Sequence, residues 1–255
     1  MHPIFFKIGD FVIYCYGVMV AFGVFTSVWL FQKESFKEGY EEKLISQLIF
    51  GIILTGILGA RFLHILVNLP YYFLHPLEII KIRNGGLAVE GAIIFSLIFI
   101  IIFTKIKNLP TAKLLDLISI YVPIGQAIGR IGCFLNGCCY GKETHFFLSV
   151  KFSFLEKRVH PTQLYYSFLY LLLFLILKKV SKRVKIGDGF IFLFYLIGFS
   201  LIRYFIDFLR GDLKETFFGL YATQLIAIFI FLIGGIFIIL KNLKKGGEKD
   251  GKTTF

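Results

Sequence analysis

The chain has 255 residues, of which 57% are hydrophobic and only 17% are charged, and its mean hydropathy is +0.78. This composition excludes an ordinary water-soluble globular domain. The formal net charge of +12 does not indicate nucleic-acid binding, because the basic residues lie mostly in short stretches between apolar runs. That distribution is typical of a protein that faces anionic lipid headgroups.

The apolar runs predict an all-α, polytopic integral membrane protein with about seven transmembrane helices. A helix needs roughly 20 mainly apolar residues to cross the hydrocarbon core, and the runs lack the alternation of barrel strands. We expect spans at residues 11–31, 45–68, 87–104, 114–137, 162–180, 188–208 and 219–240. They would form one transmembrane domain over residues 1–240, followed by a polar, disordered tail at 241–255.

The Lys and Arg residues between these spans indicate the orientation. Sixteen fall on one side of the membrane, including the tail, and nine fall on the other. Because cytoplasmic segments carry the excess, we expect the N-terminus outside and the C-terminus in the cytoplasm. The fourth loop runs against this trend with four positive charges.

Three arginines, Arg61, Arg130 and Arg203, lie within or at the ends of apolar spans. A charge at that depth costs at least about 2.5–3.5 kcal/mol on insertion scales, so each needs a compensating interaction. Arg203 and Asp207 are four residues apart and can pair on one helix face, either at a functional site or as a structural ion pair. Arg61 lies among small residues in GILGARF, which suits either a headgroup phosphate or close helix packing.

The densest group of polar and small residues is IGRIGCFLNGCCYGKET at residues 128–144. Its glycines permit close backbone approach and can present amide groups to an anion, and Arg130 supplies a donor fork suited to phosphate. The alternative is that the glycines serve helix packing only. Further along, His160 in VHPTQLYYS is a candidate proton carrier or a structural residue at a helix start. Tyr16 in YCYGVMV is a candidate site residue or an aromatic-belt tyrosine.

Four cysteines occur in or beside apolar segments: Cys15, Cys133, Cys138 and Cys139. Their spacing, with CxxxxCC at residues 133–139, lacks the paired pattern of a zinc site, so we expect neither metal nor disulfide there. A small apolar packing role for Cys133 and Cys138 is favoured. Reactive thiols near Arg130 are the alternative, because a cation lowers the pKa of a thiol.

The stretch GRIGCFLNGCCYG resembles the signature of the prolipoprotein diacylglyceryl transferases, Gly-Arg-x-Gly-Asn-Phe-x-Asn-x-Glu-x-x-Gly. Similar pieces follow in order across nearly the whole chain: Tyr16-Gly17, GARF, HPLEI at 75–79, GGLAVEG at 85–91, HPTQLY at 160–165 and RYFIDFLRGD at 203–212. Four positions depart from the family pattern. Cys133 stands for Asn, Cys138 for Glu, Glu90 for a common His, and Asp207 for a common Glu.

The resemblance implies transfer of a diacylglyceryl group from phosphatidylglycerol to the lipobox cysteine thiol of a preprolipoprotein, in a bacterial inner membrane. On this interpretation the partners are phosphatidylglycerol, lipobox segments and membrane lipids, with no cofactor, metal or nucleic acid. The departures leave open a paralogue with another acceptor, and the buried charges alone would also suit an anion transporter.

The resemblance also suggests roles for individual residues. Arg130 and Arg203 would clamp the phosphate, with Asp207 orienting Arg203. Glu90 is the first candidate for the general base, because burial would raise its pKa, and His160 is the second. The remaining candidates would contribute to substrate binding: Tyr16, Arg61, Gly132, Asn136, Gly141 and Arg210.

Overall fold

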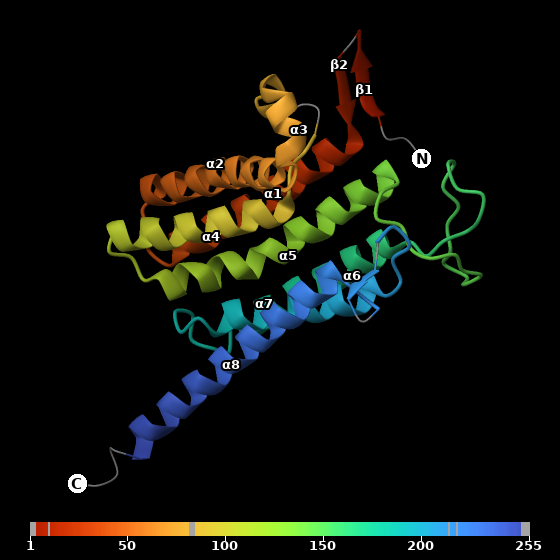
Figure 1. Cartoon of the computed structure of the whole chain (residues 1–255). Helices are drawn as coiled ribbons and strands as arrows, with labels where there is room; N and C mark the ends of the chain where they lie inside the picture. Colours follow the sequence, from red (N-terminus) through yellow and green to blue (C-terminus); the bar gives the residue numbers. More distant parts are fainter. Residues whose placement is uncertain (1–3, 10, 82–84, 214, 218, 251–255) are drawn as a thin grey trace. The chain divides into compact units, whose positions relative to one another are not determined.

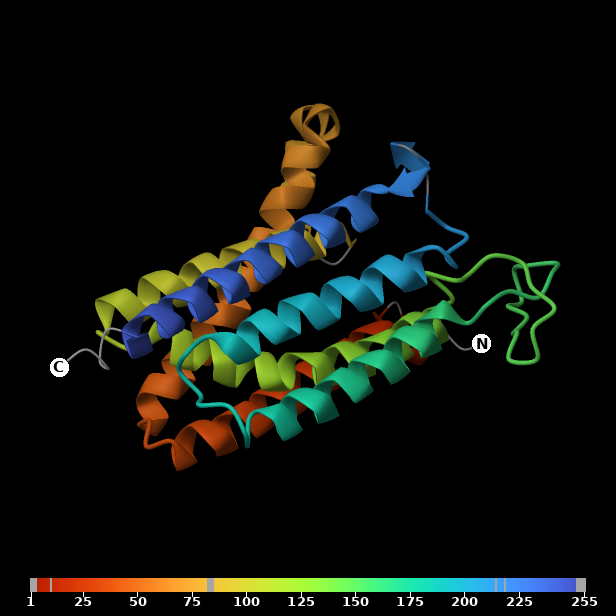
Figure 2. The same cartoon turned by 90° about the horizontal axis from the view of Figure 1, so that it is seen from below.

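The computed structural model describes residues 4–9, 11–81, 85–213, 215–217 and 219–250 (Figures 1 and 2). Among them, seven helices are long and apolar enough to cross a membrane, as the sequence predicts. These are α1 (Cys15–Lys37), α2 (Glu42–Val67), α4 (Val89–Ile106), α5 (Thr111–Asn136), α6 (Thr162–Val180), α7 (Phe190–Asp207) and α8 (Ala222–Asp250). Two short helices, α3 (Leu69–Leu74) and the 3₁₀ helix η1 (Pro76–Ile79), follow α2.

Two short hairpins replace the starts of predicted spans. Strands β1 (Ile4–Ile8) and β2 (Phe11–Tyr14) pair antiparallel, so the first helix begins at Cys15 and not at residue 11. The β2 sequence FVIY is aromatic and β-branched, which favours a strand over a helix. Strands β3 (Glu215–Phe217) and β4 (Leu220–Tyr221) likewise delay the last span to Ala222.

The last helix is longer than predicted. The backbone of α8 is helical to Asp250, whereas the sequence predicts a disordered tail from residue 241. The apolar span Ala222–Lys241 provides the helical start onto which further residues can add at low cost, because propagation is much easier than nucleation. Residues 251–255 of that tail lie outside the described residues.

The chain groups into two compact units, and the single transmembrane domain expected over residues 1–240 stays a prediction. Residues 1–31 and 112–255 form the first unit, and residues 32–111 form the second. In the second unit α2 packs on α4 through glycines: a Cβ built on Gly91 would lie 2.2 Å from the Gly59 carbonyl oxygen. The small residues beside Arg61 therefore do allow a helix to approach closely, as predicted.

The first unit is built around α5, the most buried of the seven spans. Gly125 of α5 contacts Gly23 of α1, where an added Cβ would lie 2.7 Å from the Gly125 carbonyl oxygen. On another side, Ser167 of α6 donates a hydrogen bond to the Ala127 carbonyl oxygen at 2.8 Å. Helix α7 packs against both α6 and α8, and Figure 2 shows it between them.

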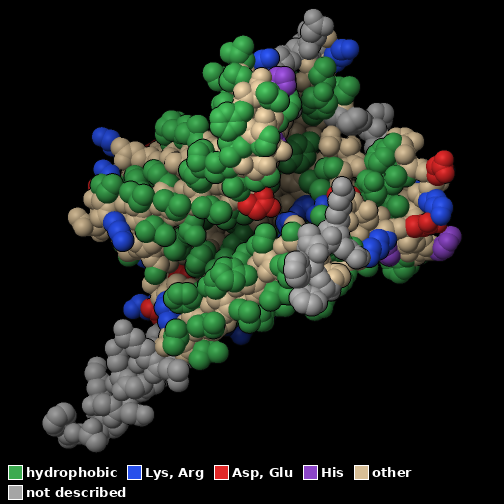
Figure 3. Space-filling model, in the orientation of Figure 1, with side chains coloured by type: hydrophobic (Ala, Val, Ile, Leu, Met, Phe, Trp, Pro, Cys, Tyr) green, Lys and Arg blue, Asp and Glu red, His purple; other side chains and the backbone are tan. Residues whose placement is uncertain are grey.

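Apolar side chains cover the outer faces of the helices. In the face shown in Figure 3, hydrophobic side chains dominate the helical surface, and charged ones lie mostly toward helix ends. Phe25 of α1, Phe168 of α6 and Phe229 of α8 are among the many exposed large apolar residues. Exposure on this scale is costly in water but suits acyl chains, so the fold is that of a multi-pass membrane protein.

A buried carboxylate that the sequence analysis did not single out fixes the start of α7. Asp116 of α5 is fully buried and accepts hydrogen bonds from the backbone N–H groups of Gly187, Gly189 and Phe192, at 2.8–2.9 Å. A carboxylate is favourable at a helix N-terminus, where these N–H groups otherwise lack partners. Asp116 therefore joins α5 to α7.

Replacing Asp116 with Ala removes the acceptor of three backbone N–H groups. Losing a single hydrogen bond to a charged group costs about 1.5–3 kcal/mol, so we expect the free energy of unfolding to fall by at least that amount. The measurement is SDS titration of the detergent-solubilised protein, followed by circular dichroism. Glu143→Ala, which removes an exposed ion pair with Lys157, is the control and should shift the value by less than about 0.5 kcal/mol. Equal losses in both variants would contradict the capping role.

Candidate active site

A buried ion pair lies at the end of α7. Arg203 Nε is 3.4 Å from Asp207 Oδ2, so the pairing predicted from their spacing is present. The Asp207 side chain has no exposed surface, and that of Arg203 is 19% exposed. Because an ionised carboxylate without partners is very costly at this depth, its other contacts determine whether the site is stable.

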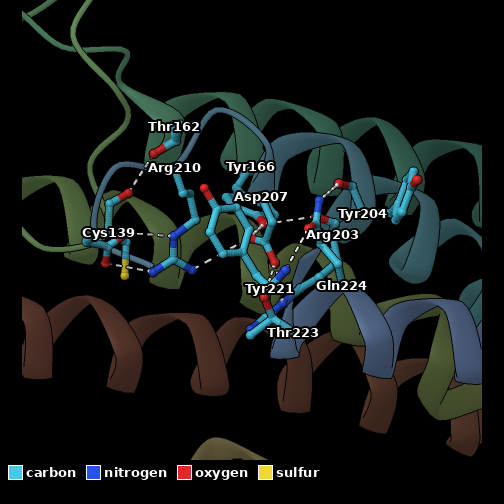
Figure 4. Close-up of polar contacts among 11 residues, drawn as sticks. Cys139, Thr162, Tyr166, Arg203, Tyr204, Asp207, Arg210, Tyr221, Thr223 and Gln224 are labelled. Atoms are coloured by element: carbon cyan, nitrogen blue, oxygen red, sulfur yellow. Dashed lines mark hydrogen bonds and ion pairs between the residues drawn. The ribbon is translucent and has the colours of Figure 1, made fainter. Parts of the chain in front are cut away.

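Asp207 is the centre of a network that draws on three helices (Figure 4). The Tyr166 hydroxyl of α6 donates to Oδ1 and the Thr223 hydroxyl of α8 donates to Oδ2, both at 2.5 Å. Arg210 Nη1 lies 3.7 Å from Oδ1. Tyr166 and Thr223 were absent from the candidates predicted from the sequence, because isolated hydroxyl residues in apolar helices carry no pattern that marks them.

Arg210 is held by carboxylates on two sides. Its Nε and Nη2 donate to the two oxygens of Asp212, at 2.9 and 2.7 Å, in addition to the contact with Asp207. The Arg210 guanidinium is buried, and this two-bonded geometry is the strongest form of the interaction. Most of its charge is therefore already neutralised within the protein.

Arg130 has different surroundings. Its guanidinium carbon lies 4.1 Å from the centroid of the Tyr166 ring, a cation–π contact. No carboxylate of the described residues lies within ion-pair distance of Arg130. Tyr166 thus contacts Asp207 through its hydroxyl and Arg130 through its ring.

The glycines after Arg130 serve mainly to bring segments together. A Cβ on Gly132 would lie 2.9 Å from Met19 Cβ of α1, and one on Gly141 would lie 2.6 Å from His160 Cβ. The Gly141 amide donates to the His160 carbonyl oxygen at 2.9 Å, so it is not available to an anion. Close approach is confirmed at these two positions, whereas open space surrounds the Cβ position of Gly129.

The three signature cysteines come together at the end of α5. Cys133 lies in the last turn of the helix, and the sulfur atoms of Cys133, Cys138 and Cys139 all lie within 4.8 Å of one another. Positive φ angles at Gly137 (76°) and Cys139 (61°) turn the chain back and make this possible. The packing role favoured by the sequence for Cys133 and Cys138 stays a prediction, and the structure adds that their sulfur atoms are neighbours. The three thiols are half-buried.

Two residues at the start of α6 fix the backbone of this turn. Thr162 Oγ1 donates to the Cys139 carbonyl oxygen and Gln163 Nε2 donates to the Cys138 carbonyl oxygen, each at 2.6 Å. Both side chains are fully buried. In this HPTQLY segment the sequence marks only His160 as a candidate site residue. Here the buried threonine and glutamine supply the support.

Tyr16, Asn136 and His160 surround the same turn. Tyr16, in the first turn of α1, is exposed, and a Cβ on Gly132 would lie 3.3 Å from its carbonyl oxygen. Asn136 is the last residue of α5 and directly precedes the turn. His160 Nδ1 lies 3.2 Å from the Tyr165 hydroxyl. Burial lowers the pKa of His160, so its imidazole is neutral at neutral pH.

An apolar pocket opens beside His160. Its volume is about 450 Å³. Its walls are almost entirely apolar and are formed by Leu148, Pro161, Leu164, Tyr165, Phe168 and Leu169. Such walls suit a hydrocarbon chain better than a charged headgroup.

In the second unit, Arg61 supports the backbone after η1. Its Nε donates to the Ile79 carbonyl oxygen at 3.0 Å, Nη1 to Gly85 and Gly86 at 2.8 and 3.0 Å, and Nη2 to Glu78. The guanidinium is buried and also lies over the Tyr72 ring. Four of its five N–H groups thus bind backbone carbonyl groups. This geometry favours the structural alternative over a headgroup contact.

The burial expected for Glu90 is wrong. Its side chain is exposed in the first turn of α4, also in the second unit. The position has a simple physical reason, because a carboxylate is favourable near the N-terminus of a helix and remains solvated there. The exposed position removes the burial on which its choice as first candidate for the general base rested.

The fold and the site define a class: a multi-pass membrane protein with buried arginines, an aspartate and thiols gathered at helix ends. The family model described as prolipoprotein diacylglyceryl transferase matches residues 3–240. Among relatives named phosphatidylglycerol-prolipoprotein diacylglyceryl transferase, that of Clostridium tetani is 38% identical over 240 residues, covering 92% of this chain and 95% of the relative.

A second relative with that name, from Bacillus velezensis, is 31% identical over 268 residues, and the match covers 98% of this chain and 95% of the relative. One from Staphylococcus aureus is 31% identical over 258 residues, covering 95% and 90%. The chain therefore belongs to the prolipoprotein diacylglyceryl transferase family, as the signature predicts.

The network makes Asp207→Asn a severe change. Removing one charge of a buried pair typically costs about 3–5 kcal/mol, and the amide cannot replace the two-oxygen acceptor that Tyr166 and Thr223 use. We expect a loss of that size in the free energy of unfolding, measured in mixed micelles. The matched control is Asp212→Asn, whose side chain is 26% exposed and which should lose clearly less. A larger loss for Asp212 would contradict the central role of Asp207.

Proposed function

We propose that this protein transfers the diacylglyceryl group of phosphatidylglycerol to the lipobox cysteine thiol of preprolipoproteins. A thioether forms and glycerol phosphate leaves, which is the first step of bacterial lipoprotein maturation. The names of the relatives support the substrates and the reaction. The structural observation that carries the proposal is Arg130, a cation beside the signature turn with aromatic neighbours and no carboxylate among the described residues within ion-pair distance.

Charge balance distinguishes Arg130 from Arg203 and Arg210, the two arginines at the end of α7 and just after it. Arg203 and Arg210 face Asp207, and Arg210 also faces Asp212. Arg130 is therefore the first candidate to bind the lipid phosphate, and Arg203, oriented by Asp207, is the second. Fixed cations in a site of low dielectric stabilise charge that develops on a leaving phosphate. Arg210 would bind substrate only weakly and would act mainly by holding the loop after α7.

The chemistry is a displacement at carbon. The acceptor thiol loses its proton, and the sulfur electron pair attacks the glyceryl carbon that bears the phosphate. The carbon–sulfur bond forms as the carbon–oxygen bond breaks, and its electron pair leaves on the glycerol phosphate oxygen. Tyr16 and Asn136 would position the glycerol portion, with Gly132 and Gly141 holding the backbone around it. The apolar pocket beside His160 suits an acyl chain.

We assign the site to the outer side of the membrane. In the first unit, its residues lie at the start of α1, α6 and α8 and at the end of α5 and α7, which are the same side for helices that alternate in direction. The excess of Lys and Arg between spans supports an outside N-terminus. For a bacterial inner membrane protein, the site would then meet the outer leaflet, and the C-terminus would lie in the cytoplasm.

The geometry favours His160 over Glu90 as the proton acceptor. His160 is half-buried beside the signature turn and is neutral at neutral pH, whereas Glu90 is exposed in the other unit. A neutral imidazole accepts a proton, and an imidazolium does not. Arg61, bound to backbone carbonyls, would act as a positioning residue for its own unit.

Transfer of label from phosphatidylglycerol to a lipobox peptide by the purified protein tests the reaction. We expect thioether formation by the wild type and a loss of at least about 100-fold in rate for Arg130→Ala, since removing one charge-stabilising donor costs roughly 10²–10³-fold. Lys142→Ala is a charge-matched control and should retain the rate.

Each negative outcome has a defined meaning. Well-folded protein that consumes phosphatidylglycerol without labelling the peptide would point to a paralogue with another acceptor, in line with the departures from the family pattern at Cys133 and Cys138. Movement of an anion across vesicles without lipid turnover would indicate a transporter. An Arg130→Ala variant as active as the wild type would contradict the phosphate assignment.

The proton acceptor is tested by a pH profile. Because the pKa of His160 is lowered, its imidazole stays neutral at pH values below the ordinary pKa of histidine. The transfer rate should therefore fall only when the pH drops through this lowered pKa and the imidazole is protonated. We expect His160→Asn to lower the rate about 10²–10⁴-fold and to remove this acidic limb. Glu90→Gln should keep both the rate and the limb. The reverse pattern would restore Glu90 as the base.

A further inference from the structure

The cysteine cluster presents three sulfur ligands to one point. Zn²⁺ binds thiolates at about 2.3 Å in tetrahedral geometry, which corresponds to sulfur–sulfur separations of about 3.8 Å. In the structure the three sulfurs already lie within 4.8 Å of one another. Side-chain rotations that close these gaps by about an ångström would bring them onto a single ion. A thiolate donor set of this kind selects soft metals.

The surroundings support such a site in two ways. Thr162 and Gln163 hold the backbone carbonyls of Cys139 and Cys138, which fixes the turn that carries two of the ligands. The charges of Arg130 and Arg210 act on the Cys139 thiol. Three thiolates around one Zn²⁺ carry a net charge of −1, which nearby guanidinium groups offset.

We propose that Cys133, Cys138 and Cys139 bind one Zn²⁺ ion, with a fourth coordination position left open. Three protein ligands and one open position are the pattern of catalytic zinc, whereas structural zinc is closed by four. The site would be specific to chains with this cysteine-containing signature. The turn made by Gly137 and Cys139 is what supplies three ligands from a stretch of seven residues.

The open position gives the site a role in the reaction, and this part rests on the proposed function. The acceptor thiol of the lipobox would coordinate there and lose its proton, which His160 accepts, since a coordinating thiol is deprotonated outright. The sulfur retains its electron pair and attacks the glyceryl carbon, and the carbon–oxygen pair leaves with the phosphate at Arg130. The thioether product carries no negative charge, binds zinc more weakly and dissociates.

The metal site is tested without reference to activity. The full-length protein in detergent, kept reduced, is titrated with Zn²⁺ or Co²⁺, and bound metal and the thiolate-to-Co²⁺ charge-transfer band are measured. We expect one ion per chain. Cys133→Ala, Cys138→Ala and Cys139→Ala should each weaken binding by more than about tenfold, since even loss of an outer-shell partner costs roughly 10–100-fold. Cys15→Ala, outside the cluster, is the matched control and should bind like the wild type.

A second measurement covers variants that fail to fold. In the wild type, Zn²⁺ should slow alkylation of the three signature thiols and leave Cys15 unaffected. Absence of the charge-transfer band together with unprotected thiols would overturn the site. A disulfide between two of the three cysteines, if it persists in protein purified with a reductant, would overturn it as well.

Transfer assays on metal-free and zinc-loaded protein separate the two proposals. Activity restored by Zn²⁺ supports thiol activation. Zinc binding with full transfer by the metal-free protein would overturn the activation step while the site stands. Zinc binding without any transfer to a lipobox peptide would overturn activation of that thiol and, with it, the proposed function, but not the metal site.

Discussion

The buried Asp207 carboxylate is the interaction on which the site depends. It accepts hydrogen bonds from hydroxyl groups of α6 and α8 and lies against two arginines. A single charge therefore joins three helices and the loop after α7. A carboxylate at this depth is tolerated because its acceptor capacity is used from several sides. Tyr166 extends the effect, since its ring packs on Arg130 while its hydroxyl binds Asp207. The position of the arginine that we assign to the phosphate is thereby coupled to the ion pair of α7.

Around this centre, the signature stretch acts chiefly through its backbone. Gly132 lets α5 approach α1, and Gly141 lets the chain pass between His160 and the segment after α7. Their amides have structural partners or lie within helices, so the anion site that we propose would be formed by side chains and not by a nest of amides. The second unit follows the same physical logic, with Gly59 and Gly91 allowing α2 and α4 to touch and Arg61 binding the carbonyl groups of the chain between them.

The cysteines show how substitution within a retained frame can change the chemistry of a site. Where the family pattern has an amide and a carboxylate, this chain has two thiols, and a third follows directly. The turn that folds back after α5 places all three together, supported by Thr162 and Gln163. A reaction in which a thiolate is the nucleophile benefits from a metal that deprotonates the incoming thiol. The same three residues therefore suit both a soft metal and the proposed transfer.

The sequence by itself was enough to predict that the protein lies in a membrane, that it has seven spanning helices and which family it belongs to. Seven apolar runs had to be helices because backbone groups in lipid need partners within the segment, and the spacing of Arg203 and Asp207 was enough to predict their pairing. The hairpins that precede the first and the last span were not predicted, because short aromatic strands and the apolar starts of helices have similar sequences. Only the tertiary structure could identify Asp116, Tyr166 and Thr223 as polar centres, show Glu90 as exposed, and bring together thiols whose spacing argued against a metal. These features depend on contacts between segments far apart in the chain, and linear spacing does not encode such contacts.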